Sequence, residues 1–327
     1  NLTGDANTDW DPSLDGGTAA WARQQPSGGD FEIFTAALGG GGGAAITTNT
    51  VNDVQPDISG TNVAWLRDTA GTGSYDVVVH NGATETVVTT AGGCGHVRVS
   101  GNHVVWMQGA TGGRDIYHYD MSVGAPPAPI SVGAPGPYPF PDHIWPEIDG
   151  DQVVWIGSED LPSSPDDWEV FHYDLGTSTL NRVTTNTVND HGPRVDGLEM
   201  VWHEEETGNI LHRDLSLPAT TLVAAGGGSY PDVSGGIVVW QGVDADGDSE
   251  IYLTEDLGMT IVALTNDTDQ GGFIPSDIDA RIDGYAVVWE RYDGAESEIW
   301  LAVPEPASLA LLAAGGLLAL RQRRRRR

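Results

Sequence analysis

Lysine is absent from the 327 residues, and all 15 basic residues are arginines. They stand against 47 acidic residues, which gives a formal net charge of -32. Six arginines lie within the last seven residues, so residues 1–303 hold 46 acids and 9 bases. Because a body this acidic repels phosphate backbones and anionic lipid headgroups, it excludes a nucleic-acid binder and a peripheral membrane protein held by charge. We expect cations or neutral surfaces as partners.

The chain has one cysteine, Cys94, and therefore no internal disulfide, so we expect packing to hold the fold. Long amphipathic helical patterns are missing as well. The chain instead contains 44 glycines and 11 tryptophans, with several Val-Val-Trp strings. This composition predicts an all-β protein built from many short strands and tight turns. Cys94 lies near His96 in the sequence, but sequence proximity does not make a catalytic pair, and we expect no nucleophile there.

An eight-residue string recurs along the whole body. It consists of an aliphatic residue, Asp or Ser, Gly, two variable residues, two small or apolar residues and Trp. Its seven copies end at Trp21, Trp65, Trp106, Trp155, Trp202, Trp240 and Trp289. Each copy is followed by a second strand-like string such as FEIFTA or SEIYLTE, and in most units by a third such as ETVVTT. Four short strands every 40 to 50 residues are typical of a β-propeller blade.

We therefore predict a seven-bladed β-propeller of four-stranded blades over residues 1–303, as a single domain. The last repeat lacks a fourth strand, because Pro304 and Pro306 follow its third. Residues 2–16 align without a gap on residues 46–60, which places the region around Leu2 in a fourth-strand position. Pairing of this strand with the last blade would close the ring and hide two sheet edges. Since Asn1 falls inside that strand, we expect a processed or truncated start, with a signal peptide upstream.

The last 24 residues, 304–327, differ sharply from the body. They begin with Pro304, Glu305 and Pro306, continue with an uncharged stretch over 307–320, and end in five consecutive arginines. The uncharged stretch is shorter than the roughly 20 residues of a comfortable membrane span. This order of parts resembles the PEP-CTERM sorting signal of exosortase substrates in Gram-negative bacteria.

The resemblance implies an exported precursor, held transiently in the inner membrane by a hydrophobic helix over 307–320, with the arginines on the cytoplasmic side. An exosortase-type membrane protease would then process the chain near Pro304, Glu305 and Pro306. The destination would be the cell surface or the extracellular matrix, with a role in biofilms.

The body also resembles TolB-like propellers, whose blades carry a string comparable to Ser249–Tyr252 and Ser297–Trp300. The preceding turn differs, because I-D/S-G-x-x-V-V-W stands where the family has a turn of the S-P-D-G-K type. The resemblance therefore implies the fold, while the role of TolB does not follow from it.

One loop has the composition of a cation site. Asp244, Asp246, Asp248 and Glu250 alternate with other residues in a Gly-containing segment between two expected strands. Alternate carboxylates can converge on a hard cation such as calcium. We take Asp244, Asp246 and Asp248 as candidate calcium ligands, with a solvated acidic loop as the alternative. Glu250 shares a column with acids in other repeats, so we expect it to build the blade.

The aromatic and histidine residues fall into two groups. The seven repeat tryptophans end similar strands, so we expect them to pack between blades. Trp10, Trp145 and Trp168 lie outside this column, and Trp145 and Trp168 are candidates for stacking on a ligand. The same position in three repeats holds a histidine, namely His118, His172 and His212. Because neighbouring sheets pack roughly 10 Å apart, these three side chains would be too far from one another to bind one metal ion.

These observations favour an exported, monomeric and non-enzymatic propeller that binds a polysaccharide or another surface protein. We find no G-x-S-x-G elbow, P-loop or dinucleotide fingerprint in the sequence. Two alternatives remain open. One is an extracellular polysaccharide hydrolase or lyase on a propeller scaffold, and the other is a TolB-like periplasmic scaffold.

Overall fold

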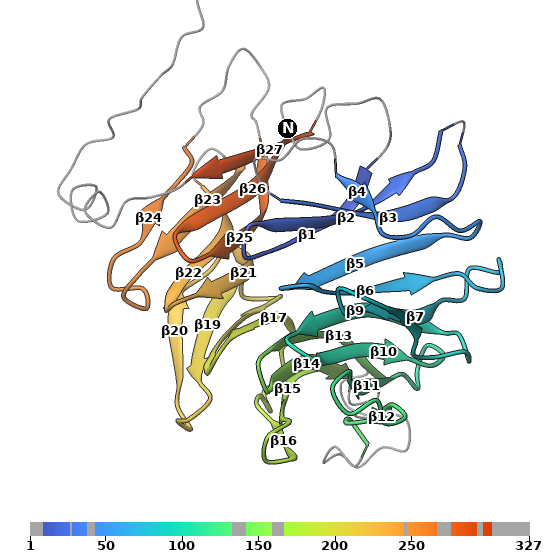
Figure 1. Ribbon diagram of the computed structural model, residues 1–327. Coiled ribbons are helices and arrows are strands. Elements are labelled where there is room, and N and C mark those ends of the chain that lie inside the picture. Colours follow the sequence, from blue (N-terminus) through green and yellow to red (C-terminus); the bar gives the residue numbers. More distant parts are fainter. Residues whose placement is uncertain are drawn as a thin grey trace, which may run out of the picture. The chain divides into compact units, whose positions relative to one another are not determined.

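A computed structural model describes residues 9–26, 28–37, 43–132, 142–158, 167–244, 247–266, 276–292 and 297–302. All regular elements in these ranges are β-strands, and they form seven sheets. Six sheets have four strands and the last has three, and consecutive strands of the chain are neighbours in every sheet (Figure 1). The all-β class and the four-stranded unit expected from the repeat are therefore confirmed.

The strands of the first two sheets are β1 (Asp9–Asp15), β2 (Thr18–Gln24), β3 (Phe31–Ala37) and β4 (Ala44–Ala45), then β5 (Asp53–Ser59), β6 (Asn62–Arg67), β7 (Asp76–His80) and β8 (Glu85–Val87). The next two sheets contain β9 (Cys94–Ser100), β10 (His103–Gln108), β11 (Asp115–Asp120) and β12 (Ala128–Pro129), then β13 (Asp142–Asp149), β14 (Gln152–Ser158), β15 (Trp168–Asp174) and β16 (Thr179–Arg182).

The fifth and sixth sheets contain β17 (Asp190–Asp196), β18 (Glu199–Glu204), β19 (Asn209–Asp214) and β20 (Thr220–Ala224), then β21 (Gly228–Ser234), β22 (Ile237–Val243), β23 (Ser249–Thr254) and β24 (Val262–Ala263). The last sheet contains β25 (Ser276–Asp283), β26 (Ala286–Tyr292) and β27 (Ser297–Ala302). Its three strands agree with the expectation that the seventh repeat has no fourth strand before Pro304. Residues 1–8, which we expect to supply that strand, lie outside the described ranges.

The glycine of the repeat makes the hairpin between the first two strands of each sheet. In the second sheet Ser59 pairs with Asn62, so Gly60 and Thr61 form a two-residue turn. Gly60 has a φ of 59°, a left-handed conformation that costs glycine little. The corresponding glycines of the other six copies have φ values between 53° and 57°. The repeated glycine is thus explained by the turn.

The Asp or Ser before this glycine joins neighbouring sheets. Asp15 accepts a hydrogen bond of 2.6 Å from the main-chain N–H of Gly60 in the next sheet. Ser59 accepts from the N–H of Gly101, and Ser100 from that of Gly150. Within each compact unit, the repeat therefore encodes a hydrogen bond between neighbouring sheets, which we call the clamp, as well as a turn.

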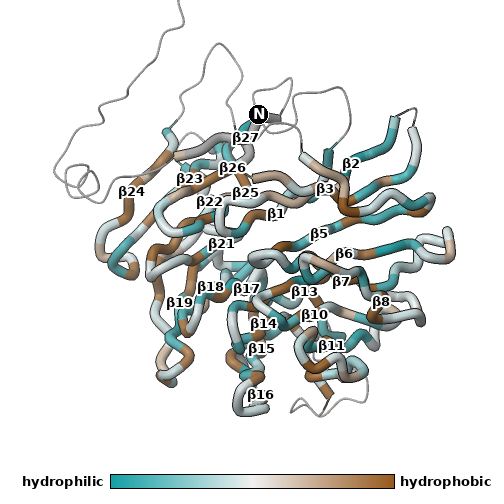
Figure 2. Tube along the Cα trace, in the orientation of Figure 1, coloured by the Kyte–Doolittle hydropathy of each residue, from teal (hydrophilic) through white to brown (hydrophobic). Residues whose placement is uncertain are grey.

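The core lies between the faces of consecutive sheets, and the chain divides into two compact units, Asn1–Leu198 and Glu199–Arg327. In the first unit, Ala20, Ile33 and Trp65 belong to one cluster that joins the first two sheets. In the second unit, Val239, Ile251 and Trp289 belong to a cluster that joins the last two. Apolar stretches recur along the strands in Figure 2, as expected for sheets covered on their faces.

All seven repeat tryptophans are buried, with exposed fractions of 6% or less. Several indole N–H groups are paired, for example Trp65 with Asp53 at 2.9 Å and Trp155 with His143 at 3.0 Å. The expectation that this column packs the sheets together is therefore confirmed.

The described ranges contain no helix that is long and apolar enough to cross a membrane. The stretch 307–320, where we expect a hydrophobic helix, lies outside these ranges, as do Pro304, Glu305 and Pro306.

Candidate binding site

A strained position recurs in the first strand of most sheets. Asp11, Gln55, His96, Trp145 and Tyr230 have φ values between 48° and 56°, although none is glycine. The pairing with the second strand shifts at each of these positions, which marks a β-bulge. A positive φ costs a non-glycine residue roughly 1–2 kcal/mol, and a bulge re-aims the side chain that it carries. Such strain in variable residues of a repeat points to a functional surface.

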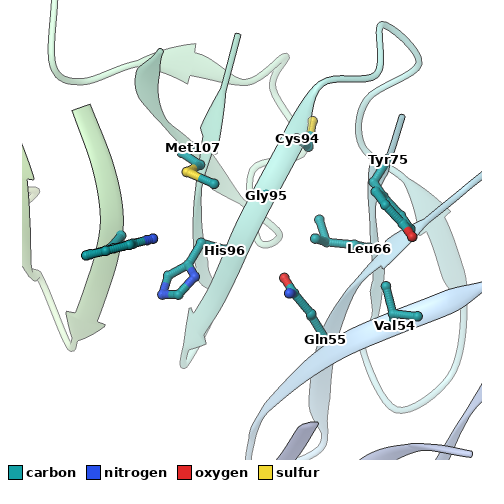
Figure 3. Close-up of a pocket in the computed structure, with 9 residues that line it drawn as sticks. Val54, Gln55, Leu66, Tyr75, Cys94, Gly95, His96 and Met107 are labelled. Carbon is teal, nitrogen blue, oxygen red and sulfur yellow. The ribbon is translucent and has the colours of Figure 1, made fainter. Parts of the chain in front are cut away.

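Three of these residues line one hollow in the first unit. The hollow has a volume of about 310 Å³ and is lined by Val54, Gln55, Leu66, Tyr75, Cys94, Gly95, His96, Met107 and Trp145. Figure 3 shows Gln55 on β5 and His96 on β9, with Met107 close to His96. This volume is at the lower end of small-molecule sites, which run from about 300 to 1,000 Å³. The hollow therefore suits one small ring or one side chain of a larger ligand.

An aromatic row extends from this hollow. The rings of His96 and Trp145 lie 6.3 Å apart, those of Trp145 and His191 lie 6.1 Å apart, and those of His191 and Trp168 lie 6.5 Å apart. Trp145 is 41% exposed, and the other three residues are half-buried. The two tryptophans that we selected from the sequence thus contact the same histidine. We call His96, Trp145, His191 and Trp168 the aromatic row.

The two tryptophans reach this row from different strands. Trp145 lies inside β13, at its bulge, and is followed by Pro146. Trp168 is the first residue of β15, and its main-chain N–H donates to the Asn189 side chain at 3.0 Å. Trp10, the third tryptophan outside the repeat column, stacks on Phe31 at 4.7 Å and is 54% exposed.

A charged network supports the row from within the same strands. Glu147, two residues after Trp145, accepts a hydrogen bond of 3.0 Å from Arg98 and forms an ion pair with Arg194. Arg98 also lies 3.4 Å from the imidazole of His96. Burial raises the pKa of Glu147, but the two guanidinium groups outweigh it and hold that pKa at about 2. These contacts fix the strands on which His96 and Trp145 sit.

Cys94 and the three histidines that share one position of the repeat have structural roles. Cys94 is buried, and burial raises the pKa of its thiol to about 11, which keeps it protonated at neutral pH. His118 lies 3.0 Å from His103, His172 lies 2.7 Å from Gln152, and His212 contacts Glu199. Each histidine of the shared column thus bonds within its own sheet.

Two of the three candidate calcium ligands come together, and a third acid joins them. Asp244, Asp248 and Glu250 each place a carboxylate oxygen within 4.8 Å of the others. Asp246 lies outside the described residues. Sequence reasoning assigned Glu250 to blade building alone and missed its position beside Asp248. The antiparallel pairing of β22 and β23, with Glu250 opposite Gly242, brings it there.

Comparison with solved structures identifies the fold. The β-propeller domain of the trilobed protease from Pyrococcus furiosus is 13% identical, with a TM-score of 0.65, 91% of this chain covered and 96% of that one. Pyrococcus horikoshii acylaminoacyl peptidase is 12% identical, with a TM-score of 0.60 and 94% of this chain covered. TolB from Acinetobacter baumannii is 14% identical, with a TM-score of 0.46, 75% of this chain covered and 62% of that one.

The likeness to the trilobed protease domain and to the acylaminoacyl peptidase shows a β-propeller fold. The chain covers 54% of the acylaminoacyl peptidase, so it spans about half the length of that enzyme. No curated protein matches the chain.

The C-terminus matches a family model. Residues 302–327 match the PEP-CTERM protein-sorting motif, as the Pro-Glu-Pro string, the apolar stretch and the arginine cluster predict. The motif implies export and processing by an exosortase, and it indicates C-terminal membrane anchoring in Gram-negative bacteria. The chain therefore combines a β-propeller body with a PEP-CTERM sorting motif.

Proposed function

We propose that this chain is an exported, non-enzymatic β-propeller that binds a ligand at the cell surface or in the extracellular matrix. The sorting motif supports the export, and the aromatic row supports the binding. The observation that carries the proposal is Trp145, which is held at a strained bulge and is nevertheless 41% exposed. A side chain that only packed the fold would be expected to be buried and unstrained.

The ligand class follows from charge and shape. Residues 1–303 hold 46 acids and 9 bases, which disfavours anionic partners. Indole rings offer flat apolar area with one polar edge, which suits stacking on a ring of similar shape. A neutral polysaccharide, bound through its sugar rings, is the partner that fits both properties, and a neutral surface of another protein would use the same row.

We also propose the finer architecture that the repeat predicts. The seven described sheets fit seven blades in one domain over residues 1–303. Residues 1–8 would supply the fourth strand of the last blade. Residues 304–327 would form the sorting signal, with a helix over 307–320 that anchors the precursor until exosortase acts at Pro304, Glu305 and Pro306. The mature protein would then be a monomer at the surface or outside the cell.

Binding to neutral polysaccharides tests the function. We would purify the full chain in a mild detergent and screen it on a glycan array and by co-sedimentation with insoluble polysaccharides. Trp145→Ala and Trp168→Ala should each weaken binding at least about tenfold, because buried aromatic anchors dominate interface energies. Trp10→Ala is the matched control, since Trp10 is also exposed but lies outside the row.

Two results would contradict the proposal. Binding that is equally strong in Trp145→Ala and Trp168→Ala would remove the aromatic row as the site. A polymer that becomes shorter on incubation with the chain would replace the binding protein with a hydrolase or lyase.

A further inference from the structure

The hairpin between β22 and β23 brings three acids together in the second unit. The main-chain N–H of Asp244 donates to the carbonyl oxygen of Asp248 at 3.1 Å, which closes the loop. The N–H of Gly247 donates to the Asp244 side chain at 3.1 Å. Two residues into β23, Glu250 pairs with Gly242 across the hairpin. The oxygens of Asp244, Asp248 and Glu250 thus lie within 4.8 Å of one another.

Asp248 is a buried acid. Only 8% of the residue is exposed, and neither carboxylate oxygen accepts a hydrogen bond from the residues that the structure describes. An ionised group in this position is costly unless something compensates its charge. Its nearest charged neighbours in the cluster are Asp244 and Glu250, which have the same sign. A cation bound beside this carboxylate would compensate the charge of its ionised form.

A loop acid with a structural role behaves differently in another sheet. Asp68 directly follows β6, as Asp244 follows β22. Both oxygens of Asp68 are used, because they accept the main-chain N–H groups of Thr72 and Gly73 at 2.9 Å each. Asp68 shows how a buried acid holds a hairpin of this fold. Asp244 behaves in the same way, because it accepts the main-chain N–H of Gly247. Asp248 accepts no such bond from the described part of the hairpin, so loop building does not explain its position.

Negative charge is concentrated around this hairpin. Burial and the neighbouring carboxylates of Asp244 and Glu250 raise the pKa of Asp248 to about 6. Burial and the same three acids also raise the pKa of Tyr252 on β23. The hairpin thus gathers three acidic side chains around one buried position.

We propose that Asp244, Asp248 and Glu250 bind one divalent, oxygen-preferring cation, for which Ca²⁺ is the probe. Opposite oxygens around Ca²⁺ lie about 5 Å apart, because each bond measures about 2.3–2.6 Å. The spacing of at most 4.8 Å among the three ligand atoms fits within that limit. Carboxylates are ligands that Ca²⁺ prefers, and extracellular modules bind Ca²⁺ with Kd values of about 0.1–1 mM.

Terbium luminescence and Ca²⁺ titration test the site on the full chain after removal of metals with a chelator. Tyr252 and Trp240, whose rings lie 5.9 Å apart, would sensitise Tb³⁺ bound at the hairpin. We expect one saturable site that Ca²⁺ displaces with a Kd on the order of 0.1–1 mM, as in extracellular modules. Asp248→Asn and Asp244→Asn should each weaken Ca²⁺ binding at least about tenfold.

Asp256→Asn is the matched control, because it removes the same charge from the turn that follows β23 and should leave Ca²⁺ affinity unchanged. Asp244→Asn and Asp248→Asn are measured as two separate variants, so a folding defect in one of them does not decide the test. The proposal is overturned if the parent chain shows no saturable site up to about 10 mM Ca²⁺, well above the expected Kd. It is equally overturned if Asp248→Asn binds as tightly as the parent, since binding would then reflect the general acidity of the chain.

Discussion

Glu147 in β13 and Asp248 at the β22–β23 hairpin are both acids in protected positions, but their surroundings have opposite charge. Glu147 lies between Arg98 and Arg194, and its pKa falls to about 2 in spite of burial. Asp248 lies beside Asp244 and Glu250, and burial together with these acids raises its pKa to about 6. The first arrangement is complete within the chain. In the second, no ion pair found among the described residues gives Asp248 a positive partner.

The difference shows how a chain with so few bases uses them. Only 9 arginines serve 46 acids in residues 1–303. Two of them neutralise Glu147, where the first strands of consecutive sheets pack together. None of the ion pairs found among the described residues joins an arginine to Asp248. A protected acid with its counter-charge supports the fold, whereas one without it marks a site for an external cation.

The largest expected effect comes from removing the charge of Glu147. Glu147→Gln leaves Arg98 and Arg194 close together without their shared carboxylate. Breaking a buried pair in this way costs about 3–5 kcal/mol, so we expect the free energy of unfolding to fall by about 3 kcal/mol in urea titrations at pH 7. Glu85→Gln is the control, because Glu85 also pairs with an arginine but is 39% exposed. It should cost less than about 1 kcal/mol, and equal losses would contradict the comparison.

The two acids should also respond to pH with opposite sign. The depressed pKa of Glu147 gives stability that is full above about pH 4.5 and is lost as pH falls towards 2. The raised pKa of Asp248 works in reverse, so without a divalent cation stability should fall as pH rises from about 4 to about 6.

Asp248→Asn isolates the second effect. In the presence of a chelator the variant should be more stable than the parent by about 1 kcal/mol above pH 6 and equal to it below pH 4, since it removes an uncompensated charge. Saturating Ca²⁺ should reverse the order, because only the parent gains stability from the ion. Urea titrations at pH 4 and pH 7.5 measure the stability difference in chelator and its reversal by Ca²⁺. A parent that is the more stable protein in chelator would show that Asp248 is not destabilising.

The smallest expected effect concerns the clamp between sheets. Asp149→Ala removes the acceptor for the main-chain N–H of Gly197, a bond of 2.7 Å. Because this bond is exposed to solvent, we expect a loss of about 0.5–1 kcal/mol in the same titrations. Asp151→Ala is the control, since its side chain is 55% exposed and lies 3.6 Å from His103. A loss equal to that of the control would mean that the clamp contributes nothing to stability.

The sequence predicted most of the fold because each level of the pattern has a local physical cause. Gly60 and its six counterparts need a left-handed turn. The consecutive apolar residues that end at each repeat Trp need cover on both faces of the strand. Both requirements act within about ten residues and are repeated seven times, so they are visible without a structure. The third strands and the short fourth strands followed from the same periodicity.

The aromatic row and the Glu147 network were harder to predict because they join residues one repeat apart. Trp145 and Trp168 were selected only because they fell outside the Trp column, and His191 was not selected. A signal was present, since Asp57, Arg98, Glu147 and Arg194 occupy one column of the repeat and alternate in sign. Their pairing needed the knowledge that the first strands of consecutive sheets pack together. Glu250 was missed as a ligand because acids at the same position in other repeats suggested a role in building the blade.

The arginines of the body also determine how a protease would meet this protein. Arg23, Arg67 and Arg98 lie within strands, and Arg114 directly precedes β11 with its main-chain N–H bound to Asp142. A trypsin-like enzyme cuts after lysine or arginine and needs an extended, accessible segment of chain. Since lysine is absent, such an enzyme finds its basic residues in the body inside hydrogen-bonded sheets. Cleavage at these arginines would therefore require the strands to separate first.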